Sequence, residues 1–177
     1  MLTRLELARR IYASSNLKGV FVLRSGALSN EYFDKYRFES VPALLREIVI
    51  AMAELVPVET EILAGLELGG VPLATALCQA TGLPAAFVRK TAKTYGTCKL
   101  AEGASVEGKN VLVIEDVVTS GGQIVQSVTE LRKLGAEVSS VLCVIDRESG
   151  AAGVLEKEGL SLRALFSMSE LRSAAGI

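Results

Sequence analysis

The chain has 177 residues, of which 50% are hydrophobic and 22% are charged, and its formal net charge is −1. This length and this balance predict a globular fold with a substantial core and exclude a disordered chain. The near-neutral charge also argues against a protein that binds nucleic acid through a broad basic face.

The composition also narrows the possible location and chemistry. No apolar run approaches the roughly 20 residues of a membrane span, and the first residues lack the pattern of a signal peptide, so we expect a cytoplasmic protein. The sequence has no histidine, which excludes a His-based catalytic triad and argues against a zinc site. The cysteines lack metal-ligand spacing and indicate a reducing compartment.

The N-terminal part of the chain is predicted to combine a helix with a small hairpin. Apolar residues recur at helical spacing over residues 2–15, which predicts an amphipathic helix. Residues 19–23 and 31–35 predict two short strands, with a turn at 24–30 between them. Composition alone favours a surface hairpin. The alternative is a small hood over an active site, with aromatic side chains and a cation facing a planar anionic ligand.

The first strand of a larger sheet is predicted at residues 61–65, after a helix at 42–55 that Ser40 is expected to cap. This strand runs into Gly69 and Gly70, and a second helix follows to residue 80. A glycine pair at a strand-to-helix junction allows the backbone to approach a ligand closely. A tight turn without a ligand explains the segment equally well.

A cationic segment follows the next strand, which is predicted at residues 84–88. Residues 89–103 include Arg89, Lys90 and Lys93 and almost no large apolar side chain. Such a segment cannot bury itself, so we expect a mobile loop. It is either a solvated surface loop or the local source of positive charge that an anionic ligand would need.

A wholly apolar run at residues 111–114 predicts a strand that is buried on both faces, as in the middle of a parallel sheet. Glu115 and Asp116 follow it, at the carboxyl end where open parallel sheets bind their ligands. Residues 119–122 then offer hydroxyls and backbone N–H groups at the start of a helix, which suits a phosphate. Acids for sugar hydroxyls or a metal thus lie close to amides for a phosphate. The plain alternative is a strand, a turn and a helix with two solvated acids.

The rest of the chain continues the alternation of strands and helices. The predicted elements are a helix that ends at Gly135, a strand at 137–145, a turn at 146–150, a helix at 151–157, a strand at 160–166 and a helix at 169–174. Alternation from residue 40 onward predicts an α/β fold with a mainly parallel sheet flanked by helices.

Residues 111–123 resemble the phosphoribosyl diphosphate (PRPP) motif of type I phosphoribosyltransferases: four hydrophobic residues, two acids, two hydrophobic residues, Thr and small residues. The run lacks the Gly-Lys-Ser/Thr ending of a Walker A loop. From residue 23, Leu-Arg-Ser-Gly-x-x-Ser-x-x-Tyr-Phe-Asp resembles the N-terminal signature of orotate phosphoribosyltransferases. From residue 89, Arg-Lys-x-x-Lys resembles their catalytic loop. The resemblance covers nearly the whole chain and implies one domain, residues 1–177, with a hood at about 1–37.

This resemblance implies a transferase that moves the 5-phosphoribosyl group of PRPP to orotate, giving orotidine 5′-monophosphate and diphosphate in pyrimidine biosynthesis. The implied catalytic residues are Lys93, Glu115 and Asp116. The implied PRPP contacts are Arg89, Lys90, Lys93, Tyr95, Glu115, Asp116, Val117, Val118, Thr119, Ser120, Gly121, Gly122 and Gln123. The implied diphosphate loop is Glu67, Leu68, Gly69 and Gly70, with a non-proline cis peptide near Glu67-Leu68. The implied orotate contacts are Arg24, Thr119 and Arg147.

The same resemblance implies a cofactor and a partner. Mg²⁺ would be held mainly by the substrate, with Asp116 as a candidate protein ligand. The Arg89, Lys90 and Lys93 loop would close over the active site of a second subunit, so a homodimer is expected, and no nucleic-acid or membrane partner is.

The chain departs from the family pattern at three positions. Gly69 and Arg24 stand where lysine is usual, and Tyr95 stands where histidine is more common. Tyrosine can donate a hydrogen bond but does not titrate near neutral pH. Two other functions stay open: a phosphoribosyltransferase for another nucleobase, such as a purine, and a PRPP-binding regulator without turnover.

Overall fold

The structure is a computed structural model that describes residues 2–22, 26, 28–91 and 100–177. Its helices are α1 (Arg4–Ser15), α2 (Tyr36–Glu39), α3 (Pro42–Ala53), α4 (Gly70–Thr81), α5 (Gly122–Lys133), α6 (Ala151–Lys157) and α7 (Met168–Ala175). Its strands are β1 (Asn16–Val22), β2 (Leu28–Phe33), β3 (Ile62–Leu66), β4 (Ala85–Val88), β5 (Ala101–Gly103), β6 (Asn110–Val118), β7 (Glu137–Asp146) and β8 (Ser161–Ser167).

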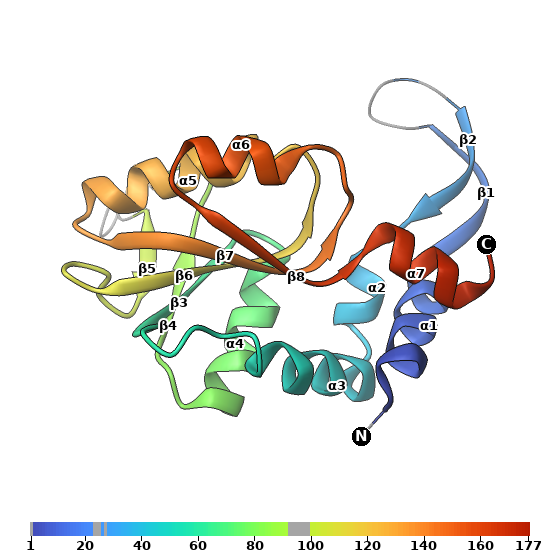
Figure 1. The fold of residues 1–177 in the computed structure, drawn as a ribbon, viewed down its shortest axis with the longest axis horizontal. Coiled ribbons are helices and arrows are strands. Elements are labelled where there is room, and N and C mark those ends of the chain that lie inside the picture. Colours follow the sequence, from blue (N-terminus) through green and yellow to red (C-terminus); the bar gives the residue numbers. More distant parts are fainter. Residues whose placement is uncertain (1, 23–25, 27, 92–99) are drawn as a thin grey trace.

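A six-stranded sheet in the order β5-β4-β3-β6-β7-β8 forms the centre of the molecule, and all its neighbouring pairs are parallel except β4 with β5. Figure 1 shows α3 and α4 on one face and α5 and α6 on the other. The mainly parallel α/β fold predicted from the sequence is therefore confirmed. Parallel strands need covered faces, which explains why β3 is buried along its whole length.

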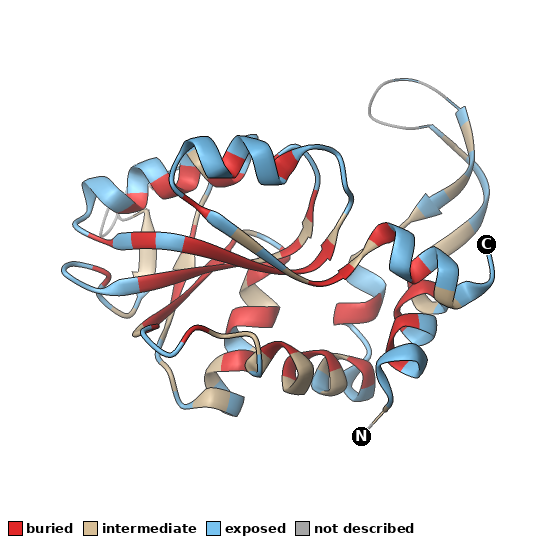
Figure 2. Cartoon of the chain, in the orientation of Figure 1, coloured by how far each residue is buried: buried red, intermediate tan, exposed pale blue. Residues whose placement is uncertain are grey.

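The core lies in two layers, one on each side of the sheet. Alternate strand residues enter different layers, so Leu63 packs on the α3 and α4 side while Ile62 and Ala64 pack on the α5 side. Figure 2 shows the buried residues gathered along the strands and on the helix faces that meet them. No helix within the described residues is long and apolar enough to cross a membrane.

Strands β1 and β2 form a separate antiparallel hairpin that extends away from the main sheet (Figure 1). Both strands begin three residues earlier than the sequence predicted. The hairpin's outer part exposes Val20, Val22 and Leu28. At its base, Tyr12 of α1 contacts Phe33 of β2 with ring centroids 6.2 Å apart.

The predicted N-terminal helix begins at Arg4 rather than at residue 2, because Thr3 is its N-cap. The Thr3 hydroxyl accepts a hydrogen bond from the Glu6 N–H, and the Glu6 carboxylate accepts from the Thr3 N–H, which makes a capping box. The prediction that Ser40 caps the second long helix was wrong. Val41 is the N-cap of α3, and Ser40 ends the short helix α2, which the sequence analysis did not predict.

Strand β6 is longer than the apolar run that predicted it. It continues to Val118, paired with β7 as far as Asp146. Glu115 and Asp116 therefore lie inside the strand and not after its end, which corrects the sequence-based boundary. The short strand β5 was also missed, because Ala101–Gly103 carries no strand pattern and is held by pairing with β4.

Candidate active site

A cavity of about 770 Å³ lies at the carboxyl end of the sheet. Its wall is formed by residues from β2, the start of α2, the end of β6, the loop into α5, the first half of α5, the turn after β7, and Lys90. The sequence-predicted residues that line it are Lys90, Glu115, Val117, Thr119, Ser120, Gly121, Gln123 and Arg147. Tyr32, Phe33 and Lys35 line it too, so the base of the hairpin faces the same space as the β6 loop.

The loop from β6 into α5 presents a helix N-terminus to this cavity. Gly121 precedes the helix with φ of 78°, a left-handed conformation that glycine adopts without strain. No side chain caps α5, so the N–H groups of its first turn are not used by a cap. Together with the hydroxyls of Thr119 and Ser120, they make this end of the cavity suitable for a phosphate.

Glu115 and Asp116 have different environments. The Glu115 side chain lines the cavity, whereas the Asp116 side chain is fully buried. The Asp116 carboxylate accepts a hydrogen bond from Lys35, with Nζ 2.9 Å from Oδ1 and 2.7 Å from Oδ2. It also accepts from the N–H of Val117 at 2.5 Å. The Asp116 carboxylate therefore pairs with groups of the protein itself in this structure. Glu115 is the acid of the pair that faces the cavity.

A third acid, Glu39 at the end of α2, lies in the same cluster. It is buried, and its Oε1 has no hydrogen-bond partner within the described part of the chain. Burial raises the pKa of Glu39 well above its usual range, and the nearby Asp116 carboxylate raises it further. Burial and Asp116 raise the pKa of Glu115 in the same way. Ionisation of Glu39 and Glu115 is thus less favourable than for an exposed carboxyl, and Asp116 forms the ion pair with Lys35.

The loop of residues 67–70 adjoins this acid cluster on the side of Asp116. Its Glu67-Leu68 peptide bond is cis, at the position that the resemblance implied. None of its four residues lines the cavity: Gly69 and Gly70 are buried, Glu67 is half-buried, and Leu68 is exposed elsewhere. A Cβ added at Gly69 would collide with the Asp116 carboxylate, which occupies that space. Glu67 accepts a hydrogen bond from the N–H of Lys90 at 2.6 Å, so this loop is tied to the cationic segment.

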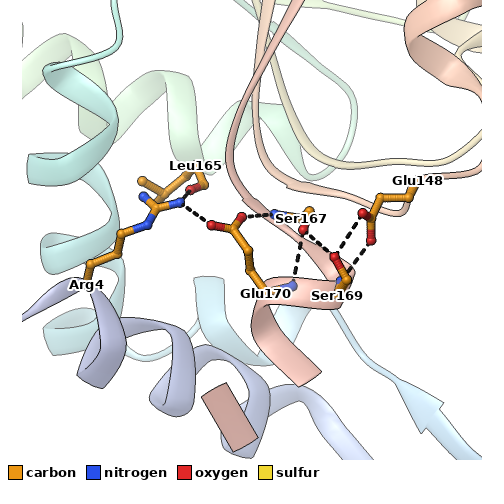
Figure 3. Close-up of polar contacts among 6 residues, drawn as sticks. All are labelled: Arg4, Glu148, Leu165, Ser167, Ser169 and Glu170. Carbon is orange, nitrogen blue, oxygen red and sulfur yellow. Dashed lines mark hydrogen bonds and ion pairs between the residues drawn. The ribbon is translucent and has the colours of Figure 1, made fainter. Parts of the chain in front are cut away.

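The turn that carries Arg147 is fixed at both of its sides. The Arg147 N–H donates to the Val118 carbonyl at 2.9 Å, at the end of β6. Glu148 has φ of 57°, and its carboxylate accepts hydrogen bonds from the N–H and hydroxyl of Ser169 at 2.8 and 2.9 Å. Figure 3 shows this carboxylate at the start of α7. Arg147 itself lines the large cavity and a neighbouring one of about 240 Å³ under the hairpin.

Comparison with known proteins identifies the family. Residues 38–162 match the model of the phosphoribosyl transferase domain. The chain is 49% identical over 168 residues to an orotate phosphoribosyltransferase of a Nocardioides species, covering 95% of this chain and 94% of the relative. It is 44% identical over 167 residues to one of Methanocella arvoryzae, covering 94% and 95%.

The chain belongs to the orotate phosphoribosyltransferase family.

Solved structures of this orotate phosphoribosyltransferase family agree with the fold. The chain is similar to the Mycobacterium tuberculosis orotate phosphoribosyltransferase in complex with Fe(III) dicitrate, with a TM-score of 0.87 and 36% identity over 95% of this chain and 98% of that one. It is also similar to the same enzyme in complex with PRPP, with a TM-score of 0.83 and 34% identity over 96% and 98%.

Arg24, Lys93 and Tyr95, which the sequence analysis placed in the site, lie outside the described residues. Lys35 and Glu39 belong to the acid cluster but were not predicted. Lys35 follows the Tyr-Phe-Asp signature directly, so that signature marked its neighbourhood, whereas no pattern in the sequence singled out Glu39.

Replacing Glu148 with alanine is expected to destabilise the protein by about 1 kcal/mol, because the start of α7 loses a carboxylate that accepts two hydrogen bonds. For a protein of this size the melting temperature should fall by about 2–4 °C. The control is Glu156→Ala on the exposed face of α6, which should melt within about 1 °C of wild type. Equal melting temperatures for the two variants would contradict an anchoring role for Glu148.

Proposed function

We propose that the protein transfers the 5-phosphoribosyl group of PRPP to orotate, forming orotidine 5′-monophosphate and diphosphate in pyrimidine biosynthesis. The observation that carries this proposal is the common cavity at the carboxyl end of the sheet. A helix N-terminus, Glu115 and Arg147 face that cavity, and these are the groups that a phosphate, a ribose and a carboxylated base require. The names of the two relatives compared above agree with it.

The site divides into three parts in this proposal. The loop of residues 119–123 binds the 5′-phosphate through the N–H groups at the start of α5 and through hydroxyls. Glu115 lies next to the ribose, and its ionised form favours the positive charge that develops at C1′ as the diphosphate leaves. Arg147 binds the orotate carboxylate, for which a planar guanidinium is well shaped, with Thr119 beside it. Positioning and electrostatics then carry the reaction without a covalent intermediate on the protein.

Mg²⁺ fits this site as an ion carried mainly by the substrate. Asp116, the acid that the sequence suggested as its protein ligand, is fully buried and paired with Lys35. Within the described residues, no cluster of three or more Asp, Glu, Cys or His side chains is arranged to hold a metal. The ion, when bound, would neutralise part of the charge on the departing diphosphate.

The cationic segment is proposed to act across a homodimer. Lys90 lines the cavity, and the Arg89 N–H donates to the Leu100 carbonyl at 2.9 Å, which joins the two ends of the segment. Arg89, Lys90 and Lys93 would neutralise the diphosphate, with Lys93 reaching the site of the second subunit. Sedimentation velocity tests the assembly: a dimer at micromolar concentration is expected, and a monomer that retains full activity would refute the shared site.

The decisive experiment follows orotate consumption by its ultraviolet absorbance, with PRPP and Mg²⁺ present or individually withheld. We expect consumption only when both are present. Parallel reactions with adenine, guanine, hypoxanthine, xanthine and uracil test for another base, and turnover of one of these without orotate turnover would replace the proposal. Binding of PRPP by calorimetry with no product from any base would indicate a regulator.

Replacing Arg147 with alanine is expected to raise the KM for orotate on the order of 30-fold, as loss of a charge-assisted bidentate hydrogen bond typically does. The KM for PRPP should change by no more than about twofold, because in this proposal Arg147 binds the base while the loop of residues 119–123 binds the phosphate. Steady-state kinetics with each substrate varied in turn measures both values. Arg46→Ala, on α3 and outside the cavity wall, is the control. Equal effects on the two KM values would remove Arg147 from the carboxylate site.

A further inference from the structure

The Lys35 side chain reaches from the residue before α2 to the middle of the site, where it meets Asp116 on β6. Its side chain is 35% exposed, whereas the Asp116 side chain is 0% exposed. Lys35 also lines the large cavity, so its ammonium group lies between a buried acid and the ligand space. An ammonium has three N–H donors, and the hydrogen bond to Asp116 Oδ1 uses one of them. Lys35 therefore retains donor capacity toward the cavity.

The ammonium is held in its charged form at this position. Burial alone would lower the pKa of Lys35, but the hydrogen bond and charge of Asp116, together with the charge of Glu115, outweigh it and raise the pKa. The Lys35 Nζ also lies 5.3 Å from the centre of the Tyr36 ring, a cation–π distance. These contacts fix a permanent positive charge on the cavity wall.

This positive charge lies close to the loop of residues 67–70. Asp116, the partner of Lys35, fills the space next to Gly69, so the ammonium lies beside that loop and the start of α4. The loop contains Glu67 and no cation of its own. On the described wall of the cavity the other cations are Lys90, which is tied to Glu67 through its N–H, and Arg147, which lies on the turn after β7.

We propose that Lys35 is a substrate-binding residue: its ammonium, held beside Gly69 by Asp116, donates to the diphosphate group of PRPP. This inference rests on the proposed function, since it takes PRPP as the ligand. Asp116 is then a positioning residue that holds the cation, and Glu115 is the acid that remains for the ribose. A diphosphate carries several negative charges, and the protein itself has a net charge of −1. Each cation near the diphosphate site therefore strengthens diphosphate binding.

The test compares Lys35→Gln with wild type by calorimetric titration of PRPP and of inorganic diphosphate, each with Mg²⁺, and by steady-state kinetics. Loss of a hydrogen bond to a charged group predicts dissociation constants weaker by about 10-fold or more for both ligands. The KM for orotate should stay within about twofold. Lys35→Arg, which keeps the charge, should restore part of the affinity. Lys109→Gln removes a lysine that pairs with Glu61 at the other end of β6 and should change neither constant.

A second pair of variants separates binding from the cost of leaving Asp116 without its partner. In Asp116→Asn the buried charge is absent, while the amide oxygen can still accept a hydrogen bond from Lys35 and keep it in place. This variant is compared with Asp116→Asn combined with Lys35→Gln for binding of inorganic diphosphate. We expect the variant without Lys35 to bind about 10-fold more weakly. Equal dissociation constants in this pair would overturn the inference and leave Lys35 as a structural counter-ion. Failure of the wild type to bind PRPP at all would instead refute the proposed function.

Discussion

Replacing Gly70 with alanine is expected to destabilise the protein by about 3 kcal/mol or more, because a Cβ there would collide with the backbone carbonyl of Ile114 on β6. Gly65 on β3 is part of the same close contact, since a Cβ at Gly65 would lie 2.5 Å from the carbonyl oxygen of Gly70. The two strands cannot separate to make room, because Gly65 and Ile114 are paired in the parallel sheet. The start of α4 is thus packed directly on the backbone of β3 and β6.

Urea and thermal denaturation measure this effect, and a fall in melting temperature of about 6–12 °C corresponds to 3 kcal/mol in a protein of this length. The matched control is Gly153→Ala within α6, where an added Cβ meets nothing within 4 Å. That variant should be more stable than wild type by about 0.5–1 kcal/mol, because alanine has the higher helix propensity. A Gly70→Ala protein as stable as wild type would contradict the close approach of the helix to the sheet.

Replacing Lys93 with alanine is expected to lower kcat on the order of 100-fold or more while leaving the fold intact, as loss of one charge stabiliser of a leaving group typically does. The expectation rests on the resemblance of the cationic segment to the family's catalytic loop. Circular dichroism and the melting temperature check the fold, and stopped or continuous orotate assays give kcat. Lys133→Ala, which removes an exposed lysine paired with Glu130, is the control and should retain wild-type kcat. Unchanged turnover in Lys93→Ala would remove the segment from the mechanism.

The same variant can test whether the segment acts across the dimer. If Lys93 serves the neighbouring site, mixing Lys93→Ala with Arg147→Ala should give more activity at low orotate concentration than the two variants give separately, because one site of each mixed dimer then has both residues intact. If Lys93 serves its own site, each subunit of the mixture retains its own defect and no activity is gained.

Most strands and helices and the turn that carries Arg147 could be predicted from the sequence, because each is encoded in neighbouring residues, whereas α2 and β5 could not. A run of apolar residues identifies β6, and the small residues of the loop before α5 identify a helix start. The exact end of β6 could not be predicted in this way. Glu115 and Asp116 look like the end of a strand, yet pairing with β7 extends the strand beyond them. A neighbouring strand overrides the local pattern there.

The acid cluster illustrates the other limit of sequence reasoning. Lys35 and Asp116 are 81 residues apart, and no periodicity links two such positions. The same holds for Glu148 and Ser169, which are 21 residues apart and meet only because β8 returns the chain beside β7. Residue types alone suggested that both acids of the motif face the ligand. The structure shows one of them buried, because Lys35, the residue before α2, is available to pair with it.

The position of Glu115 and Asp116 inside an extended strand has a consequence for how the site can change by insertion or deletion. Neighbouring residues of a strand point to opposite faces of a sheet. On the face of β6 that meets α4, Asp116 lies beside Gly69 and Ile114 lies beside Gly70. Glu115 lies on the opposite face of the strand. Loss of a single residue upstream in β6 would turn both acids to the opposite faces: Asp116 would take the place of Glu115, and Glu115 would take the place of Ile114, next to Gly70. These two positions can therefore change by substitution during evolution, but not by insertion or deletion of a residue in the strand.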